Sequence, residues 1–374
     1  MRKIIRIFIV LIAVSALAIG GYFIWQYNSP GDKPATSPSP SPKTSVLPGL
    51  SPTPIVISNN VLSLWEGPTL SGYYINNGRA ITVSENGLVN SVKGQDVQSL
   101  KSAAFGEAII KIIPSFDGKW FLEKWGNNSS PKFSLFDIEN KSWIKLSDVN
   151  YMDMDFAPGE SKIIYLEQVN GKINLGIIDL TKKTKDGFTR SVINSLTLRD
   201  SEITWASSDV ILFKEKPAAR IPSSIWKYTI SSKNFEPLIT GQNGLWLEWN
   251  KTVNYGIKFT NVEDGRLEVI DARGENIFTL PFITFPDKCV LNADSLYCAV
   301  PQIPPLSKEL PDDYLKRAFY TNDLFYKADL KSGKLELLFG VSASPLLDVK
   351  DLKIEGNKLY FINRYDKKLY QLSL

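Results

Sequence analysis

The sequence predicts an all-β protein: a β-propeller of about seven blades, preceded by a single N-terminal transmembrane helix and a stalk rich in proline and serine. Three observations lead to this prediction. An apolar run of nineteen residues follows a basic N-terminus, eight of the 22 prolines fall within residues 28–54, and a strand–turn–strand unit recurs seven times beyond them. We therefore divide the chain into a basic tip and anchor at 1–27, the stalk at 28–54 and the propeller at 55–374.

The run over residues 7–25 has Ser15 as its one clearly polar side chain. As a helix it would span roughly 28 Å, against about 30 Å of bilayer hydrocarbon. The basic residues before it favour a cytoplasmic N-terminus and a propeller outside, in a single-pass protein of the cell membrane. The alternative is a cleaved signal peptide with its cleavage site at Ala16–Ala18. Under both interpretations, the body of the protein is exported.

Residues 28–54 alternate Ser-Pro and Thr-Pro dipeptides and contain little that could be buried. Such a sequence cannot form a strand ladder and favours extended polyproline II structure. We expect a disordered, semi-rigid stalk that holds the body away from the membrane. A PxxP ligand for a signalling module is the alternative, but this segment would lie outside the cytoplasm.

The body repeats one unit, in which an apolar strand ends in a large residue and a polar turn leads to a second apolar strand. The leading large residues are 41, 40, 49, 44, 42 and 63 residues apart. Most of these intervals match the roughly 40–45 residues of a four-stranded propeller blade. Six or eight blades are the alternatives to seven, because the first unit is weakly marked. The seven units carry their turns at Ile75–Gly78, Phe116–Gly118, Phe156–Gly159, Trp205–Asp209, Trp249–Thr252, Leu291–Asp294 and Ile354–Asn357.

A second repeat places an aspartate at the end of a strand, just before a turn. Its clearest copies are Asp137, Asp179, Asp271 and Asp329. A carboxylate or calcium site is one interpretation of these aspartates. The other is that each carboxylate accepts hydrogen bonds from backbone amides of the turn that follows it. We favour the second interpretation, because a single binding site would not need one such aspartate in each blade.

Residues 156–167, FAPGESKIIYLE, resemble the W/F-S-P-D-G-x-x-I-A-F repeat of the TolB-type, WD40-like β-propellers. The resemblance extends over 55–374 and is clear in two or three units. It implies the propeller fold without implying an activity. The order of anchor, stalk and propeller, with the segment KCVLNADSLYCAVP, also resembles uncharacterised bacterial surface proteins.

The last unit supplies three strands, at 351–354, 358–363 and 368–374. We expect the segment Ile55–Trp65 to supply the fourth. Such closure would join the two ends of the body and hide both edges of the open β array.

The two cysteines, Cys289 and Cys298, flank a turn at 292–295. In a hairpin centred on that turn they face each other at a non-hydrogen-bonded position, where side chains approach most closely. An oxidising compartment then favours a disulfide over two free buried thiols. The spacing is not the C-x-x-C of redox-active pairs, so we expect a structural bridge.

The 63-residue interval contains an insertion, Pro301–Asp323, between the second and third strands of blade six. Pro311, followed by Asp312 and Asp313, predicts the start of a short helix. A shorter insertion, Lys214–Ser224, occupies the matching connection of blade four, so both should lie on one face. A partner-binding rim is one interpretation, and a plug that packs on the propeller is the other.

The candidate ligand-binding residues follow from the rim interpretation, because aromatic and arginine side chains supply much of the contact energy at interfaces. They are Asp312, Asp313, Tyr314, Arg317, Phe319 and Tyr320 in the longer insertion and Arg220 in the shorter one. The expected function is a binding or scaffold module for a protein or cell-envelope polymer, attached to the membrane through its N-terminal helix. We expect no cofactor and no metal.

Composition excludes several other classes of function. Lys and Arg number 43 against 39 Asp and Glu, and three basic residues stand at the extreme N-terminus, so the body is nearly neutral. A nearly neutral body argues against nucleic-acid binding. The absence of histidine excludes Ser-His-Asp and Cys-His nucleophiles and histidine-based zinc sites, and two cysteines cannot form a four-thiolate site.

The alternative function is an exported hydrolase that acts on glycans or peptides through carboxylates lining the propeller channel. Asp148, Asp153 and Asp155 lie close together in the sequence, but the last two alternate with apolar residues, as in a half-buried strand. A glycosidase needs two carboxylates directed at one point. No such pair stands out, so we assign no catalytic residue and favour a non-enzymatic role.

Overall fold

The computed structural model describes residues 61–374 apart from 103–106, 147–148, 186, 198–200 and 341–344. The predicted anchor and the predicted stalk lie outside these residues. Within the described part of the chain, no helix has the length and apolar character needed to cross a bilayer.

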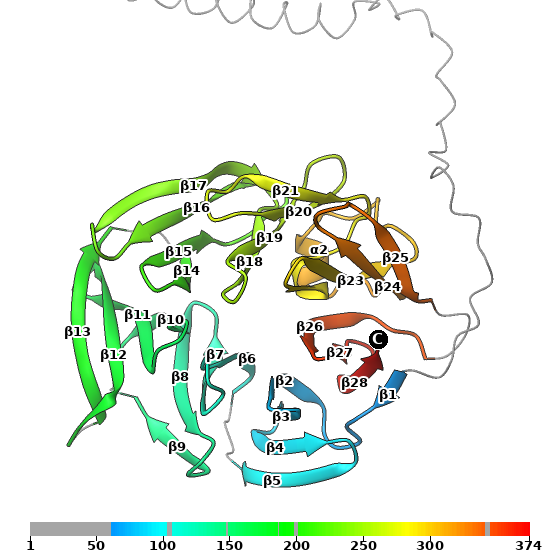
Figure 1. Ribbon diagram of the computed structural model, residues 1–374. Coiled ribbons are helices and arrows are strands. Elements are labelled where there is room, and N and C mark those ends of the chain that lie inside the picture. The colour runs from blue at the N-terminus through cyan, green and yellow to red at the C-terminus, as the bar shows by residue number, and fades with distance from the viewer. Residues whose placement is uncertain (1–60, 103–106, 147–148, 186, 198–200, 341–344) are drawn as a thin grey trace, which may run out of the picture. The chain divides into compact units, whose positions relative to one another are not determined.

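The described residues form seven four-stranded antiparallel sheets arranged around a common axis (Figure 1). The structure thus confirms an all-β propeller with seven blades. In each blade the strand that comes first in the blade lies nearest the axis, where it contacts the first strands of neighbouring blades. Among the residues that the structure describes, two short helical segments lie outside the sheets: the 3-10 helix η1 (Pro286–Lys288) and the α-helix α2 (Asp312–Leu315).

The strands of the first four blades are given from the axis outward. Blade one contains β2 (Leu70–Asn76), β3 (Arg79–Ser84), β4 (Leu88–Lys93) and β5 (Asp96–Ser102). Blade two contains β6 (Ile109–Pro114), β7 (Trp120–Asn127), β8 (Ser130–Asp137) and β9 (Ser142–Lys145). Blade three contains β10 (Tyr151–Phe156), β11 (Lys162–Val169), β12 (Lys172–Thr184) and β13 (Gly187–Leu196). Blade four contains β14 (Ser201–Ser207), β15 (Val210–Glu215), β16 (Pro222–Thr229) and β17 (Asn234–Asn243).

The remaining three blades follow the same order. Blade five contains β18 (Trp246–Asn250), β19 (Tyr255–Thr260), β20 (Arg266–Ile270) and β21 (Asn276–Leu280). Blade six contains β22 (Cys289–Asn292), β23 (Ser295–Pro301), β24 (Asp323–Asp329) and β25 (Leu335–Phe339). Blade seven contains β26 (Val349–Glu355), β27 (Lys358–Asn363), β28 (Lys368–Ser373) and, outermost, β1 (Val61–Ser63).

Blade seven joins the beginning and the end of the described chain. Strand β1 pairs antiparallel with β28, and Val61 lies opposite Leu372. This pairing confirms, for residues 61–63, the prediction that the start of the body completes the last blade; residues 55–60 lie outside the description. Leu64 and Trp65 follow β1 into a buried cluster with Leu369, so closure rests on apolar packing as well as on the ladder.

The core lies between the blades, because each sheet is covered on both faces. On β11, Ile163 packs in a cluster shared with blade two, and the next residue, Ile164, packs in a cluster shared with blade four. Both side chains are fully buried. Burial on two faces explains why the second strands of the blades carry runs of apolar residues rather than a strict alternation.

The repeated aspartates organise turns, as we favoured from the sequence. Each accepts a hydrogen bond from a backbone amide that follows it: Asp137 from Asn140 (2.9 Å), Asp179 from Thr181 (3.0 Å), Asp271 from Arg273 (2.8 Å) and Asp329 from Ser332 (2.7 Å). The turn predicted after Asp179 was wrong. Asp179 precedes a bulge inside the long strand β12, and the pairing of β12 with β13 continues beyond this bulge.

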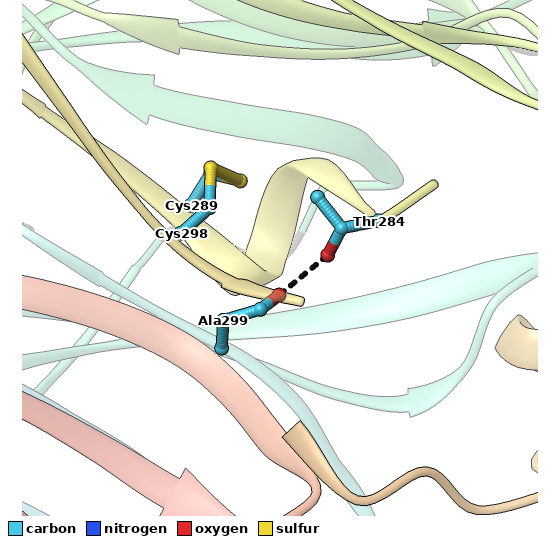
Figure 2. Close-up of a disulfide and its surroundings, with 4 residues drawn as sticks. All are labelled: Thr284, Cys289, Cys298 and Ala299. Atoms are coloured by element: carbon cyan, nitrogen blue, oxygen red, sulfur yellow. Dashed lines mark hydrogen bonds between the residues drawn. A yellow bond between two sulfur atoms is a disulfide. The ribbon is translucent and has the colours of Figure 1, made fainter. Parts of the chain in front are cut away.

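A disulfide joins Cys289 of β22 to Cys298 of β23 (Figure 2). The two residues are direct partners in the register of the hairpin, as their spacing predicted. Beside them, the buried hydroxyl of Thr284 donates to the carbonyl of Ala299 over 2.6 Å, so the segment that enters blade six is held to β23 next to the bridge.

Candidate functional site

Both predicted insertions lie on one face of the propeller. The longer one connects β23 to β24, and the shorter one connects β15 to β16. In an antiparallel sheet, these second-to-third connections lie at the end opposite the first-to-second turns. We call the end that carries both insertions the insertion face.

The longer insertion contains the predicted short helix, α2, which begins after Pro311. Two acidic residues in its first turn accept backbone hydrogen bonds, one from the shorter insertion and one from the longer insertion itself. The Asp312 carboxylate accepts the backbone N–H of Ala219 over 2.8 Å, and the Asp313 carboxylate accepts that of Glu309 over 3.0 Å. Arg220 forms an ion pair with Glu309, so the two insertions are joined by backbone and side-chain contacts.

Tyr314, in the middle of the insertion, points into the propeller. Its ring is 3% exposed and belongs to the hydrophobic cluster shared by blades five and six. Its hydroxyl donates to both carboxylate oxygens of Asp287, over 3.1 and 3.0 Å. Burial, together with the nearby charge of Asp351, raises the pKa of Asp287 to about 7. Tyr314 thus anchors the insertion and is not on the surface.

The end of the insertion is held by a buried charge network. The ammonium of Lys288, which is fully buried, donates to the Thr321 hydroxyl at 2.7 Å and to the carboxylates of Asp323 and Asp348 at 2.6 Å each. All three ammonium protons therefore have acceptors, as a buried cation requires. Burial raises the pKa of the Asp323 carboxyl, although the charge of Lys288 opposes the rise.

Arg364, in the turn between β27 and β28, connects this network to the surface. Its guanidinium donates to the Asp348 carboxylate at 3.1 Å and to the backbone oxygen of Tyr314 at 3.3 Å. It also lies over the rings of Tyr314 and Tyr320, 4.3 and 5.3 Å from their centroids. Blade seven thereby supports the longer insertion, which belongs to blade six.

Two tyrosines form an exposed aromatic pair on the insertion face. Tyr320 of the insertion and Tyr365 of blade seven are 48% and 45% exposed. Their rings stack with centroids 5.1 Å apart and planes 23° apart. Since Arg364 lies under Tyr320, this pair rests on a fixed cation rather than on a flexible loop.

A pocket of about 70 Å³ lies next to the turn between β27 and β28 in blade seven. Its lining is contributed by blades one, two and seven and by the longer insertion: Leu70, Ser71, Glu85, Ile109, Ile110, Arg317, Lys350, Ile362, Arg364 and Lys367. Hydrogen bonds from Lys367 and Thr69, together with the nearby charge of Arg317, hold the pKa of Glu85 below its usual range. The lining therefore carries four basic side chains and a single acid, which is already paired with Lys367.

The predicted ligand-binding residues thus fall into separate groups. Arg317 and Tyr320 lie at the pocket and the aromatic pair. Phe319 packs partly buried against the cluster that holds Tyr314. Asp312, Asp313 and Arg220 lie where the two insertions meet.

Sequence reasoning missed the residues that blades one and seven contribute to this site. They are Glu85, Lys350, Arg364, Tyr365 and Lys367. A signal did exist: all of them lie near second-to-third turns or at the start of a blade, which the repeat places on the insertion face.

The carboxylates considered for a hydrolase serve the contacts between inner strands. Asp153 binds the ammonium of Lys124 at 3.0 Å and the backbone amide of Ile203 at 2.8 Å. Asp155 likewise binds Lys251 and the amide of Trp205, both at 2.7 Å. Each carboxylate thus links β10 to the edge of β14, and Asp148 lies outside the described residues.

Fold and site together define a class: a closed, WD40-like, seven-bladed β-propeller whose long connections build a cationic and aromatic surface at one end. No family model matches the chain, and no curated protein matches it.

Solved structures are similar to it at low identity. The β-propeller domain of Myceliophteria thermophila Cps50 (Swd1) gives a TM-score of 0.52 at 11% identity, covering 84% of this chain and 99% of that one. A chain of the mitotic checkpoint complex gives 0.52 at 12%, covering 84% and 91%. The tricorn protease gives 0.52 at 10%, covering 86% of this chain but only 34% of the protease. At these identities the similarity establishes the propeller fold alone.

Proposed function

We propose that this chain is a membrane-anchored, extracytoplasmic binding or scaffold module that recognises a protein or cell-envelope polymer through its insertion face. Propellers commonly serve as rigid scaffolds that present connecting segments to partners. The observation that carries the proposal is the stacked, exposed pair Tyr320–Tyr365 beside the cationic pocket. Exposed tyrosines on a fixed support provide contact area at little cost in conformational entropy.

Affinity capture from a cell-envelope extract tests the binding role. The full-length protein in detergent should retain a partner, and the double variant Tyr320→Ala/Tyr365→Ala should lose most of it. Phe116→Ala is the matched control, because Phe116 is 71% exposed in the β6–β7 turn, at the opposite end of the propeller. Equal capture by all three proteins would place the binding surface elsewhere, and turnover of a glycan or peptide would favour the hydrolase alternative.

The location is tested separately on intact cells. Protease added from outside should degrade the propeller and leave a short membrane-bound fragment. A mature protein that begins after Ala18 would instead support the cleaved signal peptide, and a body protected from protease would contradict export.

A further inference from the structure

Four of the ten residues that line the pocket are basic: Arg317, Lys350, Arg364 and Lys367. Three of them have acidic partners. Arg364 binds Asp348 at 3.1 Å, Lys367 binds Glu85 at 2.6 Å, and Lys350 binds Asp351 at 3.2 Å.

Arg317 differs from the other three. Within the described residues no ion pair or hydrogen bond holds its guanidinium, which acts on Glu85 only through its charge. The site therefore presents one arginine without a direct acidic partner and two half-buried lysines to any ligand that enters.

The pocket has room for a compact anionic group. The space open to the centre of a water-sized sphere is about 70 Å³, and one water needs roughly 10–15 Å³ by this measure. The Tyr320–Tyr365 pair, joined to the pocket lining through Arg364, offers a surface for the remainder of a larger ligand.

The arrangement of the cations favours phosphate over carboxylate. Arg317 comes from the insertion, Lys350 from β26, and Lys367 from the turn between β27 and β28. Three cations on separate elements suit the oxygens of a tetrahedral phosphate, while a planar carboxylate is satisfied by one arginine.

We propose that this pocket binds the phosphate group of a sugar-phosphate unit, while the attached sugar packs against the exposed surface of the Tyr320–Tyr365 pair. The inference rests on the proposed function and names the chemistry of the polymer that the insertion face recognises. Such a unit can belong to an envelope polymer or to a free sugar phosphate, and the experiment distinguishes the two.

Calorimetric titration of the full-length protein in detergent tests the pocket, with inorganic phosphate, glucose 1-phosphate and glucuronate as probes. Both phosphates should bind, and glucuronate should bind much more weakly. Arg317→Gln and Lys350→Gln should each weaken phosphate binding about tenfold, the loss expected for one charge-assisted hydrogen bond. Lys316→Gln is the matched control, because this neighbour of Arg317 is exposed and does not line the pocket. Tyr320→Ala should weaken glucose 1-phosphate but not inorganic phosphate.

Equal losses in Arg317→Gln and Lys316→Gln would reduce the effect to general surface charge and overturn the proposal, as would glucuronate binding as tightly as phosphate or a lack of phosphate binding. Melting curves check that each variant folds. Capture from envelope extract, competed with glucose 1-phosphate, separates a polymer from a free sugar phosphate. If Arg317→Gln still captures a partner that Tyr320→Ala/Tyr365→Ala loses, the phosphate inference fails while the binding function survives.

Discussion

The ring of Tyr314 lies on the ring of Phe285, with centroids 3.9 Å apart and planes 15° apart. Tyr314 belongs to the longer insertion, and Phe285 immediately precedes η1 in the segment that enters blade six. The insertion is therefore part of the core at its centre and exposed at Arg317 and Tyr320. Tyr314 packs as the plug interpretation expects, and the rim interpretation stays a proposal for the exposed residues Arg317 and Tyr320.

Tyr314→Ala should lower the free energy of unfolding by about 3 kcal/mol, because it removes a buried aromatic ring and leaves Asp287 without its donor. Tyr314→Phe keeps the ring and should cost only about 1 kcal/mol. Chemical denaturation of both variants measures the difference. A Tyr314→Ala protein as stable as the wild type would show that the insertion is not anchored here.

Stability should fall as the pH rises above about 4.5, because Glu123 is fully buried without a hydrogen-bond partner in the described structure. Burial raises its pKa from 4.5 to about 8, so the folded state holds a proton that the unfolded state has lost. That contribution declines by up to about 1.4 kcal/mol per pH unit between these values.

Glu123→Gln should remove the Glu123 part of this slope, while Asp287, whose pKa is raised to about 7, keeps its own part. The stability of the variant should exceed that of the wild type at pH 8 and approach it near pH 4.5. Denaturant midpoints measured across this range decide the matter. Parallel pH profiles for the two proteins would mean that the Glu123 carboxylate finds a partner in solution.

Replacing both cysteines with serine should cost roughly 2–3 kcal/mol, the chain-entropy value for a loop with nine residues of separation. The loss is smaller if the hairpin is already ordered in the unfolded chain. Mass spectrometry of non-reduced peptides should find Cys289 linked to Cys298. Complete alkylation of both thiols without prior reduction would contradict the bridge.

Deleting residues 61–65 should expose the edge of β28 and cause aggregation or a large loss of stability. Two point variants test the packing alone, because both keep the backbone ladder. Leu64→Ser, at a buried position, should destabilise the protein, whereas Leu62→Ser, at a side chain that is 49% exposed, should not. Thermal unfolding and light scattering provide the readout, and a soluble, equally stable deletion would show that closure does not depend on β1.

The features that sequence reasoning predicted well depend on neighbours in the chain. Asp271 and Asp329 bond the turns that follow them, and Cys289 faces Cys298 across one hairpin. The closing strand was predictable because the last unit lacked its fourth strand. In each case a short segment, or the repeat itself, contains the information.

The features that sequence reasoning missed depend on which blades lie side by side in the fold. Glu85 and Lys367 are far apart in the sequence and pair only because the ring closes between blades one and seven. The inward direction of Tyr314 was also missed, since a one-turn helix has too few residues to show which side will be covered. Glu123 gave no signal, because charged residues at strand positions ordinarily face water.

The pairing of Val61 with Leu372 also sets an order of events during folding. A polypeptide is made from its N-terminus, so β1 exists long before β28 is available to receive it. Blades one to six can each form from local hairpins, but the seventh must wait for the last residues of the described chain. Contacts between such distant segments are slow to form. The nascent molecule therefore passes through an open ring with unpaired strand edges, and its greatest need for protection from self-association comes just before β28 becomes available.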